Sequence, residues 1–205
     1  MVSNPQALKR IALPGPLWVW GLLIGTLLAQ TAVHELSHAV ACRYYKIAVR
    51  EIGIGLRFYL FPVAYVDRTD AYRLVGRRPR VLIALAGIMA DVPWIGCCAV
   101  LADRTHGQLQ QGFVLILWLQ MALLLMNLNF LLPTDGYDAL EAGLGAINVR
   151  GRALTILRCL VLKKPRPSWL TTRSRVPYLL FGLVCLIYTA VTVGIFLWSL
   201  IILIG

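Results

Sequence analysis

Four long stretches of the chain are apolar and almost free of charge, and they constrain the fold more than any other feature. They cover about residues 17–42, 81–102, 113–132 and 177–204, and a helix needs about 20 apolar residues to cross a bilayer. Only 14% of the 205 residues are charged, against about a quarter in a soluble domain. We therefore expect an all-α integral membrane protein, a single polytopic domain over residues 1–205 with about four transmembrane helices.

The basic residues are concentrated in two of the segments between these stretches. Nine of the twenty Lys and Arg residues lie in residues 43–80 and eight in residues 133–176, whereas residues 103–112 contain only Arg104. By the positive-inside rule, both basic segments face the cytoplasm and both termini face out. Because the charge is distributed in this way and no recognition motif accompanies it, the net charge of +11 does not predict nucleic-acid binding.

Neither a signal peptide nor a cysteine-based site is expected. Lys9 and Arg10 precede the first apolar stretch, but no small-residue cleavage site follows it. The five cysteines form no C-x-x-C pair, so they predict neither a disulfide framework nor a thiolate zinc site.

The first basic segment contains the alternating sequence EIGIGLRFYLF, which starts at Glu51. Apolar residues at every second position are typical of a β-strand. We expect this strand to be half of a β-hairpin over about residues 47–66, with Pro62 near its turn or edge. In the second basic segment, a short helix is expected over residues 138–147.

The first apolar stretch ends in the sequence HELSH, which comprises His34, Glu35 and His38. In a helix, residues four apart lie on one face, about 6 Å apart along the axis, so both imidazoles can bind one metal ion. Glu35 lies about 100° further around the helix, within reach of a water at the metal but not of the metal itself. Ionisable residues within or beside a membrane span usually mark function, so the H-E-x-x-H pattern favours a zinc site.

The third ligand must come from elsewhere in the chain, and Glu51, Asp91 and Asp135 are the candidates considered. Glu51 opens the expected strand, and Asp91 lies inside the second span. Asp135 lies about 33 Å along the third span, and His34 about 25 Å along the first. Both spans are expected to enter from the outer side, so these two residues reach a similar depth. Asp135 is therefore our predicted third ligand.

The sequences HELSH and NLNFLLPTDGY, on separate spans and in this order, resemble the site-2 protease family of intramembrane zinc metalloproteases. The sequences AYVDRTDAYR and RVLIALAGIMAD resemble its bacterial branch of peptide zinc metalloproteases, so the match covers about residues 30–145. The resemblance implies one zinc ion held by both motif histidines and the D-G aspartate, on the cytoplasmic side of a bacterial inner membrane. It also implies that Glu35 is the catalytic base and that the β-hairpin after the HELSH helix is membrane-associated.

The chain departs from the family pattern at two places. Phe130 stands where the family often has the proline of an N-x-N-P run, and Ile88 and Asp91 replace the proline and asparagine of a G-P-x-x-N motif. Neither change removes a ligand or the base. For Asn127 and Asn129 two roles remain possible: contacts to the substrate or to the metal ligands, or simple hydrogen bonding at the helix end. His106 is interpreted as a surface histidine.

These observations predict an intramembrane zinc metalloprotease that hydrolyses a peptide bond of a membrane-associated protein or a small precursor peptide. Its expected partners are that substrate and the lipid bilayer, with no nucleic acid. The alternative is a catalytically silent protein that binds peptides or scaffolds a modification or export complex. A metal transporter is disfavoured, because its ligands would be spread across the bilayer.

Overall fold

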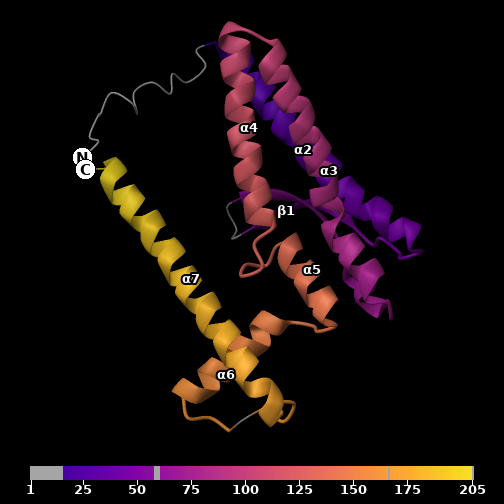
Figure 1. The fold of residues 1–205 in the computed structure, drawn as a ribbon, viewed down its shortest axis with the longest axis vertical. Helices are drawn as coiled ribbons and strands as arrows, with labels where there is room; N and C mark the ends of the chain where they lie inside the picture. The colour runs from indigo at the N-terminus through magenta and orange to yellow at the C-terminus, as the bar shows by residue number, and fades with distance from the viewer. Residues whose placement is uncertain (1–15, 58–60, 166, 205) are drawn as a thin grey trace.

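The computed structural model describes residues 16–57, 61–165 and 167–204, and the chain is mostly helical (Figure 1). Within these ranges, four helices are long and apolar enough to cross a membrane, as expected. The bounds of the third helix differ from the predicted 113–132. The helix begins earlier, because the glutamine-rich sequence after Gly107 is helical, and it ends earlier, at Asn127. The four helices are α2 (Leu17–Tyr44), α3 (Arg77–Arg104), α4 (Gly107–Asn127) and α7 (Thr172–Ile204).

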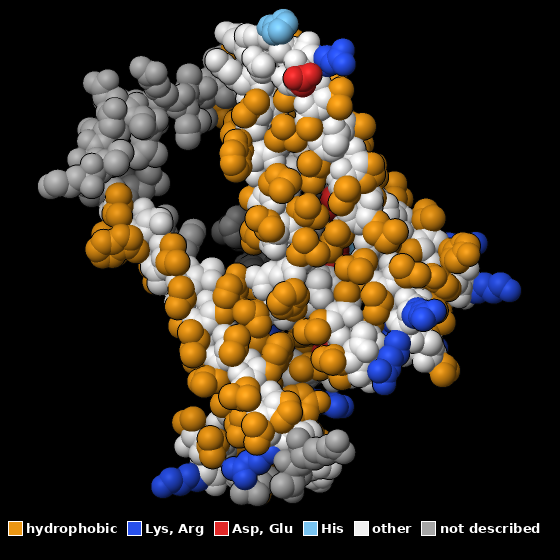
Figure 2. All heavy atoms as spheres, viewed as in Figure 1, with side chains coloured by type: hydrophobic (Ala, Val, Ile, Leu, Met, Phe, Trp, Pro, Cys, Tyr) orange, Lys and Arg blue, Asp and Glu red, His pale blue; other side chains and the backbone are white. Residues whose placement is uncertain are grey.

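The central helix of the bundle is α3, which packs against both α2 and α4 (Figure 1). Near the turn between α3 and α4, the three helices share an apolar core that includes Val19, Cys98 and Ile116. Large apolar side chains also point outward, and Leu28, Trp118 and Leu125 are each at least 65% exposed. Figure 2 shows this apolar outer surface along the long helices. An apolar exterior on helices of this length is compatible with a multi-pass membrane protein.

The expected β-hairpin is present as two antiparallel strands, β1 (Ile52–Arg57) and β2 (Phe61–Val66). The Asp67 amide donates to the Glu51 carbonyl at 2.9 Å, which makes this pair a hydrogen-bonded one. Since bonded and non-bonded pairs alternate along an antiparallel ladder, the backbone groups of Pro62, Ala64 and Val66 point away from β1. Pro62 lies inside β2 rather than in the turn, at a position where its missing N–H removes no ladder bond. The predicted strand residues 58–60 lie outside the described residues.

A 3-10 turn, η1 (Thr69–Arg73), connects the hairpin toward α3, and two short helices follow α4, namely α5 (Asp135–Leu144) and α6 (Val149–Val161). Helix α5 corresponds to the short helix expected at 138–147, whereas α6 was not predicted. The buried Glu141 carboxylate joins the two, because it accepts hydrogen bonds from the Tyr137 hydroxyl and from the Val149 amide at the start of α6. A carboxylate at a helix N-terminus is favourable for the helix dipole.

Helix α7 packs against α6 and diverges from α4 (Figure 1). The two helices approach closely at Gly182, where an added Cβ would lie 2.9 Å from Leu157 Cδ1 and 3.1 Å from the Ala153 carbonyl oxygen. A polar contact to the turn after α4 is made by the Asn129 amide, which donates to the Tyr188 hydroxyl at 2.6 Å. Helix α7 therefore forms a unit mainly with α6.

Candidate metal centre

Three predicted ligands from two distant elements meet beside α3. His34 and His38 lie one turn apart on α2, with ring centroids 5.0 Å apart. Asp135 is the first residue of α5, and its Oδ2 lies 2.9 Å from His34 Nε2 and 3.1 Å from His38 Nε2. All three side chains are buried, and their ligand atoms lie within 4.8 Å of one another. The structure thus brings together the three residues that the sequence analysis predicted as metal ligands.

The other ring nitrogen of each histidine is held by a partner behind the site. His34 Nδ1 lies 2.8 Å from Asp91 Oδ2, and His38 Nδ1 lies 2.8 Å from the Ile83 carbonyl oxygen. An oxygen acceptor at Nδ1 requires an N–H there, so the Nε2 atoms are the ones available to a metal. The buried Gln30 amide donates to the other oxygen of Asp91 at 3.1 Å. Asp91 therefore orients His34 rather than completing the ligand set.

A tight turn between α4 and α5 presents Asp135 to the histidines. Asn129 Oδ1 accepts from the Leu131 amide at 2.9 Å, and the Thr134 hydroxyl donates to the Asn129 carbonyl at 2.5 Å. At Gly136, an added Cβ would lie 2.6 Å from the backbone of Leu128. The D-G pair combines a ligand with a residue small enough for α5 to start against the end of α4. Asp135 accordingly begins a separate helix, whereas the sequence prediction placed it at the end of the third span.

Gly87 of α3 provides the space in which the ligands meet. A Cβ added at Gly87 would collide with the imidazole of His34 and lie 2.6 Å from His38 Nε2. Only a residue without a side chain leaves room for two imidazoles and a carboxylate at this point of the helix surface. The backbone of α3 therefore forms one wall of the candidate metal centre.

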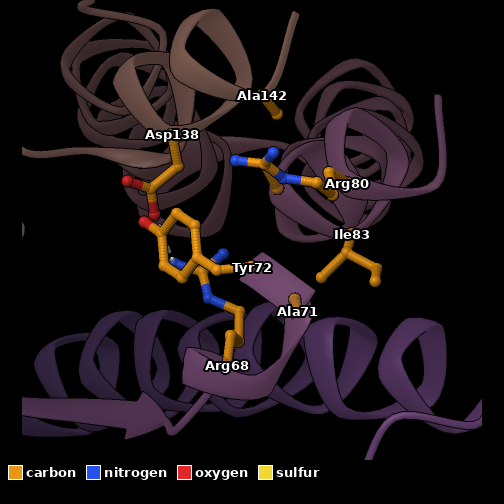
Figure 3. A pocket seen from close by; sticks show the side chains of 8 residues that line it. Arg68, Ala71, Tyr72, Arg80, Ile83, Asp138 and Ala142 are labelled. Carbon is orange, nitrogen blue, oxygen red and sulfur yellow. Dashed lines mark hydrogen bonds and ion pairs between the residues drawn. The ribbon is translucent and has the colours of Figure 1, made fainter. Parts of the chain in front are cut away.

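Arg68, in the segment after β2, adds a positive charge to the site. Its Nη2 donates to Asp135 Oδ1 at 3.1 Å and to Asp138 Oδ2 at 3.2 Å. Its Nη1 lies 3.0 Å from His38 Nδ1, an atom that already faces the Ile83 carbonyl, so the guanidinium rests against the ring instead of donating to it. Figure 3 shows Arg68 approaching Asp138 beside Tyr72, around a pocket of about 40 Å³.

The charge state of Asp135 follows from these neighbours. Burial alone would raise its pKa, but the contacts with His34 and His38 and the positive charge of Arg68 together hold the pKa of Asp135 well below its usual range. For Asp138, burial is the dominant effect, and it raises the pKa in spite of the nearby guanidinium of Arg68. Asp135 is thus the carboxylate that stays ionised, as a metal ligand must.

A cavity of about 670 Å³ opens onto one side of the ligand set. Glu35 is half-buried and lines this cavity together with His34 and Asp135. The cavity is bounded by the hairpin, through Gly55 and Ala64, and by the lower part of α4, through Asn127. His34, Asp135 and Glu35 therefore face the same cavity.

The chemistry of the three donors fits a zinc ion. Two imidazole nitrogens and a carboxylate oxygen are among the commonest zinc ligands, and bonds of about 2.0–2.1 Å in a tetrahedron place ligand atoms about 3.3 Å apart. The contacts at 2.9 Å and 3.1 Å need only a small outward movement to reach that spacing. Lone pairs that converge on one point repel one another unless a cation or protons lie between them, and a cavity adjoins the three donors.

The remaining sequence candidates lie in different surroundings. Glu51 is exposed and accepts a hydrogen bond from the Tyr65 hydroxyl at 2.5 Å, away from the ligands. Asn129 bonds to the turn and to α7, Asn127 lines the cavity, and His106 is exposed before α4.

Three contributors to the site were not predicted from the sequence: Arg68, Gly87 and Gln30. Gln30 lies in an apolar stretch four residues before His34, which puts it one helical turn away on the same face. Its position therefore indicated a place near the site. Arg68 and Gly87 act through contacts between elements far apart in the sequence. The available signals were that Arg68 lies in AYVDRTDAYR and that Gly87 stands at the glycine of the G-P-x-x-N motif.

Comparison with known proteins finds distant similarity to a protein named as a metalloprotease. The chain is 25% identical over 124 residues to the Bacillus subtilis (strain 168) protein named "Putative peptide zinc metalloprotease protein YydH". The matched region is 60% of this chain and 48% of that protein, so the chain spans about half the length of the curated relative it matches. No protein-family model matches the chain, and no solved structure matches it.

Proposed function

We propose that the protein is an intramembrane zinc metalloprotease of the site-2 type. The observation that carries this proposal is the convergence of His34, His38 and Asp135, with Glu35 on the same cavity, among helices apolar enough to span a bilayer. The distant similarity to a protein named as a peptide zinc metalloprotease supports the same reaction class. The proposed substrate is a membrane-associated protein or a small precursor peptide.

The residues of the chain divide the work of hydrolysis between them. A zinc ion held by His34, His38 and Asp135 would polarise the scissile carbonyl and lower the pKa of a water toward about 7. Glu35 takes the proton from the attacking water and delivers it to the leaving amine. Asp91 and the Ile83 carbonyl hold the imidazoles in orientation, and Arg68 holds Asp135.

The hairpin supplies a means of binding the substrate. A helical substrate shields its amide with its own hydrogen bonds, so cleavage requires an extended segment. The outward-facing backbone of β2 at Ala64 and Val66 lies along the cavity that Glu35 lines. We propose that the substrate adds to this edge as a further strand, which leaves its scissile bond beside Glu35.

The proposed location is the bacterial inner membrane, with the site on the cytoplasmic side. Lys and Arg side chains gather around the lower helix ends and connecting segments of Figure 2, and few lie at the upper turn between α3 and α4. The positive-inside rule assigns the lysine- and arginine-rich end to the cytoplasm. His34 and His38 lie in the half of α2 nearer to that end.

The decisive experiment combines zinc analysis with a cleavage assay. The full chain is co-expressed with a panel of short candidate peptides, including any encoded beside its gene, and the products are identified by mass spectrometry. We expect one zinc per chain, cleavage by the native protein, and a loss of roughly 10²–10⁴-fold in Glu35→Gln with zinc retained. Peptide binding without cleavage by the zinc-loaded native protein would instead establish the silent scaffold.

The strand-addition step is tested with two proline variants. Ala64→Pro removes an outward N–H from β2 on the cavity, and Ile54→Pro removes the equivalent outward N–H from the opposite edge on β1. We expect Ala64→Pro to reduce turnover with zinc content unchanged, and Ile54→Pro to retain turnover. Equal turnover in the two variants would dismiss the β2 edge as the binding surface.

A further inference from the structure

A cleft between α6 and the start of α7, lined by none of the residues of the candidate metal centre, combines an apolar wall with a cationic rim. Its volume is about 260 Å³. The apolar side is formed by Ile156 and Leu160 of α6 and Leu179 of α7, and the rim by Lys163, Lys164 and Arg175. None of the described residues that line it is acidic.

The surrounding sequence offers these cations no acidic partner. After Glu141 the chain contains eight Lys and Arg residues and no Asp or Glu. Among the residues that the structure describes, no ion pair involves Lys163, Lys164 or Arg175. Arg152 is occupied differently, since its guanidinium stacks over the Trp169 ring at 5.4 Å. The charge of the rim is therefore available to an anion from outside the chain.

The surroundings of the cleft are those expected at the interface between a bilayer and water. Leu179 and Arg175 both lie within the apolar stretch Ser174–Ser199 of α7, near its start. Beside them, Leu160, Val161 and Leu162 expose at least half of their surface at the end of α6. A basic helix with an exposed apolar edge is typical of the membrane interface, and Trp169 and Tyr178, in edge contact at 5.8 Å, are residue types enriched at that level.

We propose that this cleft binds an anionic phospholipid, with the phosphate at Lys163, Lys164 and Arg175 and the acyl chains along α7. The occupant must match both surfaces of the cleft. A soluble anion would use only the cationic rim, and a zwitterionic lipid would gain less from three unpaired cations. The outer face of α7 continues the apolar wall away from the rim, with Val176, Leu180 and Leu183 each at least 48% exposed. Figure 2 shows this apolar surface leading to the Lys and Arg side chains.

The test measures lipid affinity and does not depend on protease activity. The full chain in detergent is titrated with phosphatidylglycerol and, separately, with phosphatidylcholine, and bound lipid is counted by native mass spectrometry. We expect tighter binding of phosphatidylglycerol. The combined variant Lys163→Gln, Lys164→Gln, Arg175→Gln should weaken phosphatidylglycerol by at least about tenfold, since each cation near an anionic lipid contributes roughly fivefold, and leave phosphatidylcholine unchanged.

A matched control removes the same charge from the other basic surface at this end of the molecule. Lys46, Arg73 and Arg78 are exposed and lie outside the cleft, so Lys46→Gln, Arg73→Gln, Arg78→Gln should retain the phosphatidylglycerol affinity. An equal loss in both triple variants would overturn a defined site in favour of diffuse surface charge. Displacement of the lipid by excess inorganic phosphate would overturn the lipid in favour of a simple anion.

A second variant tests the shape of the cleft without changing its charge. Leu160 lines the cleft and is 58% exposed, so Leu160→Trp fills space there while retaining helix α6. We expect it to weaken phosphatidylglycerol binding with an unchanged helical circular dichroism spectrum. Unchanged lipid affinity in this variant would overturn the cleft as the binding site.

Discussion

Two parts of the molecule, the chain up to α5 and the chain from α6 to α7, differ in whether their charged side chains are paired. All nine carboxylates of the chain lie before residue 142, and the buried ones pair with histidine, arginine, glutamine or backbone groups. The part from α6 to α7 has cations and no carboxylate. Buried charge is tolerated only when it is paired, whereas unpaired charge must stay at the surface. The first part therefore builds a site within itself, and the second presents its charge to something outside.

The largest effect that would separate the two parts is expected at Gly87. In Gly87→Ala, the new Cβ collides with the ligand nitrogens of His34 and His38. Overpacking typically costs about 1–3 kcal/mol, so zinc affinity should fall by roughly 5–150-fold when measured by competition with a chelator. Gly96→Ala is the control on the same helix, since its Cβ would meet nothing within 4 Å. Equal zinc affinities for the two variants would show that α3 does not shape the site.

A similar or smaller effect is expected at Asp91. In Asp91→Asn, the side chain can still accept from His34 Nδ1 but no longer carries the negative charge that orients the imidazole and raises its basicity. Loss of such a partner typically weakens metal binding by about 10–100-fold. The control is Asp103→Asn, whose side chain is 82% exposed at the C-terminal end of α3. Unchanged zinc affinity in Asp91→Asn would exclude Asp91 as a positioning residue.

The residues of the candidate metal centre differ in how far sequence patterns predict them. The spacing of His34 and His38 is local, so one helical turn sufficed to predict a shared metal. Asp135 was predicted from depth in the bilayer, and the structure brings it to the histidines although it lies on α5 and not on the third span. The backbone of α3 at Gly87 lies against the imidazoles of α2, and the Arg68 side chain joins the segment after β2 to α5. Sequence periodicity does not describe such contacts between distant elements.

The fold shows the same division between local and distant information. The long apolar runs predicted the four helices that are long and apolar enough to span a membrane, and alternation predicted the strand. Helix α6 was missed because proline and arginine dominate the segment that follows it. Its signal was nevertheless present, since Val149, Ala153 and Ile156 repeat at helical spacing after Asn148. The side chain of Asn148 caps this helix by accepting from the Gly151 amide at 3.1 Å.

In the second part of the molecule, the test of packing is at Gly182. Its Cβ in Gly182→Ala would lie 2.9 Å from Leu157 Cδ1 and 3.1 Å from the Ala153 carbonyl oxygen, so α6 and α7 must separate slightly. We expect a loss of about 1 kcal/mol or somewhat more in the stability of the protein in detergent, measured as a lower midpoint of thermal unfolding. Gly194→Ala, which meets nothing within 4 Å, should be neutral. Zinc affinity should be unchanged in both variants. A lower zinc affinity in Gly182→Ala alone would indicate that the packing of α6 and α7 affects the metal centre.

The smallest effect is expected at Tyr188, whose hydroxyl accepts a hydrogen bond from the Asn129 amide and joins the turn beside the metal centre to α7. Tyr188→Phe should cost about 0.5–1.5 kcal/mol, the usual net contribution of one hydrogen bond, with zinc affinity retained. Tyr178→Phe is the matched control on the same helix, because the Tyr178 ring makes an edge contact with Trp169 that does not require the hydroxyl. Asn129 also bonds to the Leu131 amide and supports Thr134 through its carbonyl, so the turn that presents Asp135 has its own hydrogen bonds. If zinc affinity fell in Tyr188→Phe but not in Tyr178→Phe, α7 would be part of the support of the metal centre, and the two parts would no longer be separable.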